Sequence, residues 1–403
     1  MNISGGIMIR IGIIGTGNRG IAGYGLYILK EKNDIAQIVA VSDPDKKRLK
    51  TAQLALKIPS NCAFTDTKKL LDMENLDAVI ITSPDYTHKD IAVSAFKRNL
   101  DVLCEKPLAL TVRDCDEILA AQKKSGRILC VGFVLRYNNF YRKMYEMINI
   151  EKKIGRVVMA GAMDSVSTGS QYFFHGWWRL RKNSGGLLVQ KATHSVDILN
   201  WIVNSKPERV YGEGGLAVFG GKESNTKVCS KCSKKKNCLE SIVNKKVSWD
   251  YGVANFTMEV EDKCVFAKEI DVYDHEILTI RYQNKARAFF VENQFTPDYK
   301  REFWFIGDKG RMYGIDPYIV SEKDRKKPYL EIVYRHTRKK EVIPVKIAPG
   351  GHGGGDPALI EDFLNCCISR KKPLADGEAG RESIAICAGG EKSIETGRII
   401  NIR

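Results

Sequence analysis

The sequence predicts two domains: an α/β domain with a parallel sheet over residues 1–134, and an α+β domain with a large, mostly antiparallel, open sheet over residues 135–403. The chain of 403 residues is longer than one ordinary domain. In its first third, short apolar runs alternate with amphipathic stretches, which is typical of a parallel sheet covered by helices on both faces. After about residue 135, aromatic stretches of alternating polarity indicate antiparallel or mixed strands.

The first domain is expected to alternate strands with helices. Strands are expected at residues 9–14, 38–42, 78–81, 101–104 and 128–131, and helices at 46–56, 88–98 and 114–124. The last of these helices carries its own boundary signals, because Thr111 stands at a capping position and Gly126 at a stop position.

The second domain is expected to be richer in strands. We expect strands at residues 157–162, 210–218, 249–260, 265–270, 277–282, 303–306 and 330–334. A strong helix is expected at 187–203, and a glycine-rich loop at 349–355 precedes a final helical pair at 358–367 and 382–396.

A glycine pattern follows the first expected strand and opens a helix, as Gly15-Thr16-Gly17-Asn18-Arg19-Gly20. In this context it is the fingerprint of a Rossmann dinucleotide-binding domain. Gly15 permits the tight turn, Gly17 leaves room for a pyrophosphate, and Gly20 lets helix and strand pack closely. We therefore expect a dinucleotide to bind at Gly15, Thr16, Gly17, Asn18 and Arg19, with the helix N-terminus facing its phosphates.

Asp43 ends the second expected strand and favours NAD over NADP as the cofactor. A carboxylate at this position accepts hydrogen bonds from the adenosine ribose and repels a 2′-phosphate. The alternative is a helix-capping role before Pro44. Ser83 and Pro84 follow another expected strand, at the sheet edge where the cofactor lies, and Pro84 is either a nicotinamide contact or a loop breaker.

Several further motifs resemble those of the Gfo/Idh/MocA family of oxidoreductases. They are Pro84 followed by His88 at a helix start, the segment Glu105-Lys106-Pro107, the stretch from Gly132 to Tyr137, and Gly185-Gly186 followed by Thr193-His194-Ser195-Val196-Asp197. The resemblance implies further cofactor contacts at His88, Glu105 and Lys106. It also implies that Lys106 and His194 face the nicotinamide ring.

The resemblance implies hydride transfer between a substrate carbon and C4 of the nicotinamide. His194 then serves as the base for the hydroxyl proton, and Lys106 stabilises the alkoxide. Many family members carry an aspartate four residues before the histidine, where this chain has Gln190, which cannot take up a proton. The alternatives are an ion pair of Lys106 with Glu105 and a solvated His194 on a polar helix edge that also holds Gln190 and Asp197.

The expected substrate contacts are Gln190, Arg136, Trp178, Arg179 and His352. Trp178 and Arg179 end an aromatic segment that suits a carbohydrate, although a packed aromatic cluster is the alternative. His352 lies in the glycine-rich loop, which suggests a lid or a close backbone approach to a ligand. Asp356 is expected to cap the helix that follows.

These features predict an NAD-dependent oxidoreductase acting on a sugar, a glycoside or a cyclitol. One alternative is an NAD-dependent glycoside hydrolase that oxidises a ring hydroxyl transiently, eliminates the aglycone, adds water and then reduces the ring again. A non-catalytic NAD-dependent sensor is a further alternative, but Lys106 and His194 argue against it.

Composition excludes other classes. The net charge of +16 is spread along the chain without a nucleic-acid-binding signature, so no nucleic acid partner is expected. No membrane span and no secretory signal are expected either. Several of the eleven cysteines stand in apolar runs, which favours a reducing, cytoplasmic location. A homo-oligomer, a dimer or a tetramer, is expected from the resemblance.

Three cysteines, Cys229, Cys232 and Cys238, have a spacing that suits a structural zinc site. Cys264 and His275 are possible fourth ligands, and an iron–sulfur centre needs the same thiolates. The alternative is three exposed thiols that bind no metal.

Overall fold

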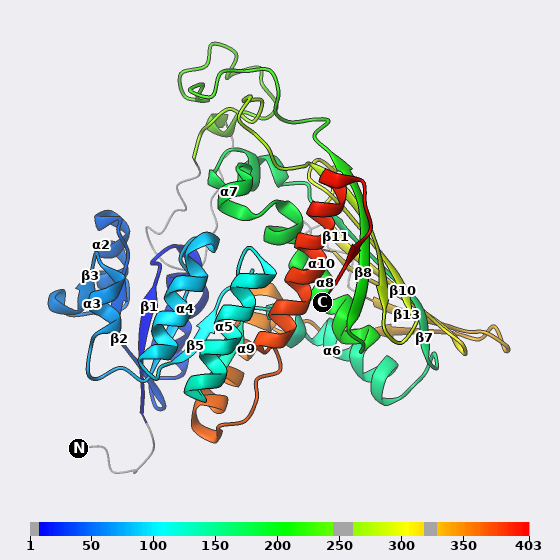
Figure 1. Ribbon diagram of the computed structural model, residues 1–403, viewed down its shortest axis with the longest axis horizontal. Helices are drawn as coiled ribbons and strands as arrows, with labels where there is room; N and C mark the ends of the chain where they lie inside the picture. Colours follow the sequence, from blue (N-terminus) through cyan, green and yellow to red (C-terminus); the bar gives the residue numbers. More distant parts are fainter. Residues whose placement is uncertain (1–7, 245–260, 318–328, 403) are drawn as a thin grey trace. The chain divides into compact units, whose positions relative to one another are not determined.

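The computed structural model describes residues 8–244, 261–317 and 329–402 (Figure 1). The chain divides into two compact units. The first contains the chain up to Tyr137 together with the segment Pro349–Arg381, and the second contains the remaining described residues. The sequence prediction placed the first boundary at residues 134/135 and assigned the whole C-terminal part to the second domain, whereas Pro349–Arg381 packs with the first unit.

The first unit has a six-stranded parallel sheet in the order β3-β2-β1-β4-β5-β6. This is the strand order of a Rossmann fold, and it places the carboxyl ends of all strands at one edge. The strands are β1 (Ile9–Ile14), β2 (Ala36–Ser42), β3 (Ala63–Phe64), β4 (Ala78–Ile81), β5 (Asp101–Cys104) and β6 (Leu129–Val131). The α-helices are α1 (Leu26–Glu31), α2 (Lys46–Ala55), α3 (Thr67–Leu71), α4 (His88–Lys97), α5 (Val112–Ser125) and α9 (Gly351–Ser369).

Short π- and 3₁₀-helical segments complete the first unit: η1 (Arg19–Gly25), η2 (Ser60–Cys62), η3 (Asp85–Thr87) and η4 (Val134–Tyr137). The expected boundary signals of α5 are confirmed. The Thr111 side chain accepts a hydrogen bond from the Asp114 amide, and Gly126 ends the helix with φ 67°. The two-residue strand β3 and the five-residue helix α3 were not predicted, because elements this short carry too little periodicity.

The second unit has a nine-stranded sheet in the order β14-β13-β12-β11-β7-β10-β9-β8-β15. Every pair is antiparallel except β10 with β7, so the predicted large, mostly antiparallel sheet is confirmed. The strands are β7 (Val157–Ser165), β8 (Pro207–Gly215), β9 (His275–Tyr282), β10 (Arg287–Asn293), β11 (Lys300–Gly307), β12 (Gly310–Pro317), β13 (Tyr329–Tyr334), β14 (Lys340–Pro344) and β15 (Ile400–Asn401).

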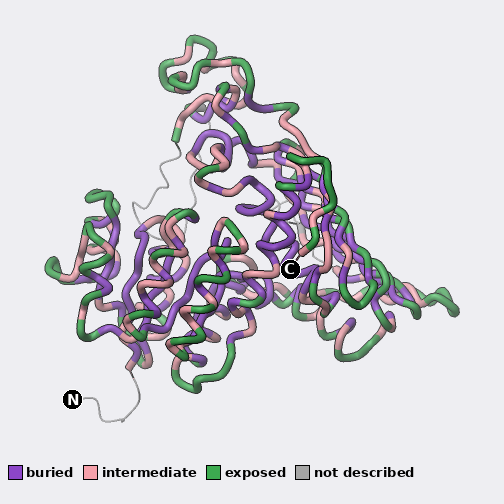
Figure 2. Tube along the Cα trace, viewed as in Figure 1, coloured by how far each residue is buried: buried purple, intermediate pink, exposed green. Residues whose placement is uncertain are grey.

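Helix α8 (Thr193–Val203) is almost entirely buried, since every residue of it except Trp201 is buried (Figure 2). The π-helical segment η8 (Leu188–Ala192) runs directly into it, so the predicted helix at 187–203 is confirmed with a π-helical first part. The other helices described there are α6 (Asn139–Tyr145), η5 (Glu146–Ile150), η6 (Ser170–Phe174), η7 (Trp177–Arg179), α7 (Arg181–Ser184), η9 (Ile242–Asn244) and α10 (Gly377–Thr396), which begins in the first unit.

One strand prediction in the second unit is wrong. Residues 265–270 form turns, in which Ala267 N–H donates to the Cys264 carbonyl and Ile270 N–H to the Ala267 carbonyl. An apolar cluster buries three residues of this segment, Val265, Ala267 and Ile270. Their close spacing in the sequence resembles the alternation of apolar and polar residues in a strand, which explains the wrong prediction. The strand expected at 249–260 lies outside the described residues. No helix of the described part is long and apolar enough to cross a membrane.

Candidate cofactor and substrate sites

The glycine turn of the first unit has the geometry that a dinucleotide requires. Gly15 has φ 93°, and a Cβ there would stand 2.4 Å from the backbone nitrogen of Ser83. A Cβ at Gly20 would stand 2.4 Å from the Gly15 carbonyl oxygen, so the helix packs against the strand only because this residue lacks a side chain.

Two features of the turn are not explained by protein packing. A Cβ at Gly17 would meet no protein atom within 4 Å, so its glycine is not required by a neighbouring side chain. The side-chain amide oxygen of Asn18 is buried and has no hydrogen-bond partner among the described residues. Open space beside a glycine and an unsatisfied buried polar atom both fit a bound pyrophosphate.

Asp43 is buried at the end of β2 and contacts the glycine turn. One of its carboxylate oxygens accepts hydrogen bonds from Thr16 N–H at 2.8 Å and from the Thr16 hydroxyl at 3.0 Å. The other accepts from Asp45 N–H at 2.9 Å. The cap of α2 is Asp45, which accepts from the amides of Lys47 and Arg48, so Asp43 does not play the capping role that the sequence left open.

Arg19 was expected to contact the cofactor, but its guanidinium group is committed to protein partners. It forms ion pairs with Glu105 and with Asp356, and its Nη2 donates to the Tyr24 hydroxyl at 2.6 Å. Burial acts to raise the pKa of Glu105, but the positive charge of Arg19 and the hydrogen bonds from Tyr24 and Arg19 together hold that pKa below its usual value. Glu105 also accepts a hydrogen bond from Lys106 N–H at 2.9 Å. Arg19 thus stabilises the segment that carries Lys106.

His88 lies buried between two loops at the carboxyl edge of the sheet. Its Nδ1 lies 2.8 Å from the Pro107 carbonyl oxygen, and its Nε2 lies 2.9 Å from the Ser83 carbonyl oxygen. Burial lowers its pKa, and the hydrogen bonds to the two carbonyl oxygens act in the opposite direction. His88 therefore joins the loop after β4 to the loop after β5, and we regard it as a residue that shapes the cofactor site rather than as a direct contact.

In the second unit, α8 is held against the sheet beside His194. The Ser195 hydroxyl donates to Asp164 at 2.7 Å, and Arg301 Nε donates to the other carboxylate oxygen of Asp164 at 3.3 Å. Gln190 and His194 are both buried, each with 7% of its surface exposed. A solvated His194, which the sequence left open, is therefore not what the structure shows.

The sequence prediction missed a polar row beneath α8. The row consists of direct cross-strand partners on five neighbouring strands, so the side chains share one face. Its members are Glu276, Glu292, Asp164, Arg301 and Asp316. Strand alternation could have indicated such a row, but the register that aligns it comes only from the tertiary structure.

The row is completed by a lysine from the π-helical segment. Lys191 is buried, and its ammonium group contacts the Tyr299 hydroxyl and lies 5.0 Å from the ring centroid. Burial and the neighbouring Asp164 raise the pKa of Glu292 to about 8, and Lys191 acts in the opposite direction. In the sequence, the position of Lys191 three residues before His194 was the only indication that a lysine joins this polar row.

Arg179 and Trp178 have structural surroundings. Arg179 is fully buried, forms an ion pair with Glu269, and donates to the Cys264 carbonyl at 3.0 Å. Trp178 packs against the apolar cluster and stacks on Trp177 at 4.6 Å. The packed alternative therefore fits Arg179, and a substrate contact does not. Arg136 is buried in the first unit and donates to the Leu374 carbonyl at 2.9 Å.

The predicted metal site is not supported by the described residues. All eleven cysteines are free thiols; Cys229 is buried, and Cys232 and Cys238 are partly exposed. Cys229 Sγ lies 4.0 Å from His175 Nδ1. Within the described ranges, no three His, Cys, Asp or Glu side chains are arranged to hold one metal ion.

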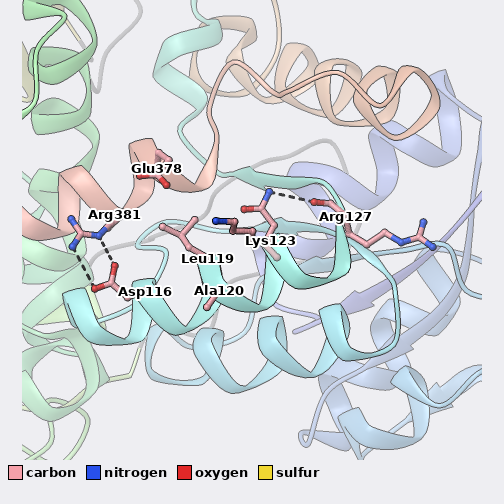
Figure 3. A pocket seen from close by; sticks show the side chains of 9 residues that line it. Asp116, Leu119, Ala120, Lys123, Arg127, Glu378 and Arg381 are labelled. Carbon is pink, nitrogen blue, oxygen red and sulfur yellow. Dashed lines mark hydrogen bonds and ion pairs between the residues drawn. The ribbon is translucent and has the colours of Figure 1, made fainter.

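A shallow hollow in the first unit lies apart from the predicted site residues, and none of them lines it. It is formed by α5 and the start of α10, where Arg381 forms an ion pair with Asp116 (Figure 3). Lys123, Arg127 and Glu378 lie on its rim, which makes it a surface of mixed charge.

The strand order and the glycine turn define a Rossmann-type, dinucleotide-binding domain. The chain belongs to the Gfo/Idh/MocA family: residues 9–133 match its "Oxidoreductase family, NAD-binding Rossmann fold" and residues 146–402 match its "Oxidoreductase family, C-terminal alpha/beta domain". The predicted resemblance is therefore confirmed, and the protein is an enzyme of the NAD(P)-dependent oxidoreductase class.

Three relatives illustrate the range of the family. YteT of Bacillus subtilis, named as an oxidoreductase, is 31% identical over an alignment of 397 residues that covers 91% of this chain and 91% of that protein. A myo-inositol 2-dehydrogenase of Thermotoga maritima is 29% identical over 213 residues, which are 52% of this chain and 59% of that protein. A levoglucosan dehydrogenase in complex with NADH and levoglucosan has a TM-score of 0.73 at 15% identity, covering 98% of this chain and 99% of that one, which shows a shared fold.

Proposed function

We propose that the protein oxidises or reduces a ring hydroxyl of a sugar, a glycoside or a cyclitol. The observation that carries the proposal is the position of Lys106, which follows β5 at the same sheet edge as the glycine turn and whose backbone is held by Glu105. Relatives named for inositol and levoglucosan oxidation support a polyhydroxylated substrate.

The proposed chemistry divides between two side chains. A bound nicotinamide supplies a hydride acceptor at C4. His194 takes the proton of the substrate hydroxyl, and the ammonium group of Lys106 stabilises the negative charge that develops on the oxygen. Gln190 orients the substrate by hydrogen bonding, and Arg136, Trp178 and His352 are further candidate contacts. This assignment does not include Arg179, because its charge is paired with Glu269 and its side chain is fully buried.

NAD is the proposed cofactor in preference to NADP. The carboxylate of Asp43 already holds the glycine turn through Thr16, so its negative charge is fixed beside the place where a ribose binds. A 2′-phosphate at that point meets a buried negative charge, which is unfavourable.

The test is a stoichiometric assay with a panel of compounds that includes myo-inositol, levoglucosan and aryl glycosides. Net formation of NADH from a polyol supports a dehydrogenase. The hydrolase alternative is supported instead if a glycoside is cleaved with NAD in catalytic amount and no net NADH forms. Exchange of the C2–H of the sugar with deuterated water supports it as well. Absence of NADH binding, measured by fluorescence of the added dinucleotide, contradicts both.

We also propose that the protein forms a homo-oligomer through the outer face of the nine-stranded sheet. Met159 and Ile306 are register partners on this face, and Phe289 and Ile277 share it. These four side chains are 37–50% exposed, which is an unusual concentration of large apolar groups on one sheet face. The free thiols fit the proposed cytoplasmic location of the enzyme.

A further inference from the structure

The helical segment that follows the glycine turn brings Tyr24 beside Arg19. This segment, η1, is a π-helix, in which residues i and i+5 lie one turn apart. The Cζ atom of Arg19 accordingly lies 4.3 Å from the centroid of the Tyr24 ring. A Cβ at Gly23 would stand 3.1 Å from Arg19 Nη1, so the glycine leaves room for the guanidinium group over the ring. Arg19 and Tyr24 are therefore stacked on one another directly after the turn.

The hydroxyl proton of Tyr24 points at Glu105. Arg19 Nη2 lies 2.6 Å from the hydroxyl oxygen, and a guanidinium group only donates, so the oxygen accepts at this contact. The side chain is fully buried, and burial raises the pKa of Tyr24 well above its usual range although the charge of Arg19 opposes the shift. The hydroxyl therefore keeps its proton and donates it to Glu105 Oε1.

The two carboxylate oxygens of Glu105 bind different partners. Oε1 accepts from the Tyr24 hydroxyl and from Arg19 Nε, whereas Oε2 accepts from Lys106 N–H at 2.9 Å. A Cβ at Gly132 would stand 2.7 Å from Oε2 and 3.1 Å from the Cα of Glu105, so the chain closes on this side chain from another direction. The Tyr24 hydroxyl thus fixes the orientation of a carboxylate that holds the backbone of Lys106.

Arg19 remains anchored when the Tyr24 hydroxyl is removed. Its Nη1 and Nη2 donate to the two carboxylate oxygens of Asp356, at 2.8 Å and 3.0 Å. Asp356 is buried, and one of its oxygens also lies 2.9 Å from Nδ1 of His352 in the glycine-rich loop. Without the hydroxyl, Arg19 is still bound to Asp356 and Glu105 is still bound to Arg19, so Tyr24→Phe is expected to fold.

Lys106 lies between two attachment points. On one side its N–H is bound by Glu105, and on the other side the Pro107 carbonyl oxygen lies 2.8 Å from Nδ1 of His88. The first attachment includes a hydroxyl group that can be removed without loss of the aromatic ring. Catalytic groups must be held within a fraction of an ångström, because a small displacement removes much of the rate.

We propose that Tyr24 is a positioning residue for Lys106: its hydroxyl fixes the Glu105 carboxylate, which holds the Lys106 backbone so that the ammonium group reaches the reacting oxygen. This rests on the proposed function, in which Lys106 stabilises the alkoxide. Tyr24 is fully buried, so it acts through Lys106 and not by contact with a ligand. Its loss should lower kcat and leave KM nearly unchanged, because the alkoxide charge develops only in the transition state.

The first test needs no substrate. Hydrogen–deuterium exchange of the Lys106 amide, followed by NMR, reports whether Glu105 still binds this N–H. We expect the amide to exchange several times faster in Tyr24→Phe than in the wild-type protein. The matched control is Tyr27→Phe, three residues further along, whose hydroxyl donates to Glu361 at 2.8 Å. Exchange in Tyr24→Phe as slow as in this control would overturn the proposal.

The second test is a double-mutant cycle with the best substrate found in the panel of compounds. We expect kcat to fall about tenfold in Tyr24→Phe, with KM and NADH affinity close to those of the wild-type protein. In the Lys106→Ala background the same change should have almost no further effect, because the residue through which Tyr24 acts is gone. A wild-type kcat in Tyr24→Phe, or an equal loss in both backgrounds, overturns the inference.

The outcomes separate the inference from the proposed function. A Lys106→Ala variant with little activity, combined with an unimpaired Tyr24→Phe variant, overturns the positioning role alone. Near-normal turnover in Lys106→Ala, or a panel without any substrate, contradicts the proposed function and removes the positioning role with it.

Discussion

Arg19 and Asp356 lie 337 positions apart in the sequence and form a two-bond ion pair, with distances of 2.8 Å and 3.0 Å. The pair fixes the start of α9 to the helix that follows the glycine turn, so the segment Pro349–Arg381 belongs to the cofactor-binding unit. Forked arginine–carboxylate pairs are both strong and geometrically specific. The glycine-rich turn and the segment of Lys106 are consequently held by one guanidinium group.

Removal of either proposed catalytic group should abolish most of the turnover. Lys106→Ala and His194→Ala should each lower kcat by roughly 10²–10⁴-fold, on the scale of general acid–base catalysis. The measurement is steady-state kinetics with the best substrate, accompanied by NADH binding to show that the cofactor site is intact. Lys97→Ala, an exposed lysine at the end of α4, is the control. Near-normal rates in both variants would refute the assignment.

Neutralising Asp43 should weaken the preference for NAD. Asp43→Asn retains an oxygen that accepts from Thr16 but loses the charge that repels a 2′-phosphate and binds the ribose. A hydrogen bond to a charged group contributes about 1.5–3 kcal/mol, so the ratio of kcat/KM for NAD to that for NADP should fall about tenfold or more. A ratio unchanged from wild type contradicts the proposed role of the carboxylate.

Arg179 should matter for stability and not for substrate affinity. In Arg179→Met the partly exposed Glu269 loses its partner, and the carbonyl groups of Phe174 and Cys264 lose a donor, so the free energy of unfolding should fall by about 3 kcal/mol. Denaturant unfolding measures this change, with Lys182→Met, an exposed neighbour, as the control. A normal stability combined with a large rise in KM would restore the substrate contact predicted from the sequence.

The buried carboxyl groups beneath α8 should make the protein less stable as the pH rises. The folded-state pKa of Glu292 is about 8 because the side chain is buried and Asp164 lies nearby, whereas the unfolded chain ionises at an ordinary value. Between those two values the folded state holds a proton that the unfolded state has lost, so the free energy of unfolding decreases with pH.

Glu292→Gln should therefore flatten this slope. The free energy of unfolding of the wild-type protein should decrease from pH 5 to pH 8 by up to about 1.4 kcal/mol per pH unit for each such carboxyl group, and its thermal midpoint should fall with it. The amide still accepts the hydrogen bond that Gln294 donates, so the variant should fold. An identical pH dependence in the two proteins would show that Glu292 is ionised in the folded state.

Charges placed on the outer sheet face should dissociate the proposed oligomer. Ile277→Lys combined with Ile306→Lys introduces two ammonium groups among the exposed apolar side chains, and light scattering should show a shift to the monomer. Leu54→Lys, on the exposed surface of α2, is the control. A wild-type protein that is itself monomeric would contradict the proposal directly.

Much of the first unit could be predicted because its signals are local. The glycine turn, the Thr111 cap and the Gly126 stop each depend on a few consecutive residues, and the structure contains all three. The second unit was harder, since the turns at 265–270 bury apolar residues at intervals that resemble a strand. Strands β10, β12 and β14 were not predicted, because their limits depend on pairing with partners elsewhere in the chain.

The sequence by itself determined the fold class, the family and the two residues to which we assign the chemistry. The reason is that the glycine turn and the family motifs each consist of a few consecutive residues, so they can be recognised without the tertiary structure. Only the tertiary structure decided that Arg19 holds Glu105 and Asp356, and that Arg179 pairs with Glu269. It also decided that acidic side chains of separate strands align beneath α8. An unpaired charge is very unfavourable inside a protein, so each buried charge needs a partner close by. Which residue lies close by depends on how distant parts of the chain pack together, and residue type alone does not reveal it.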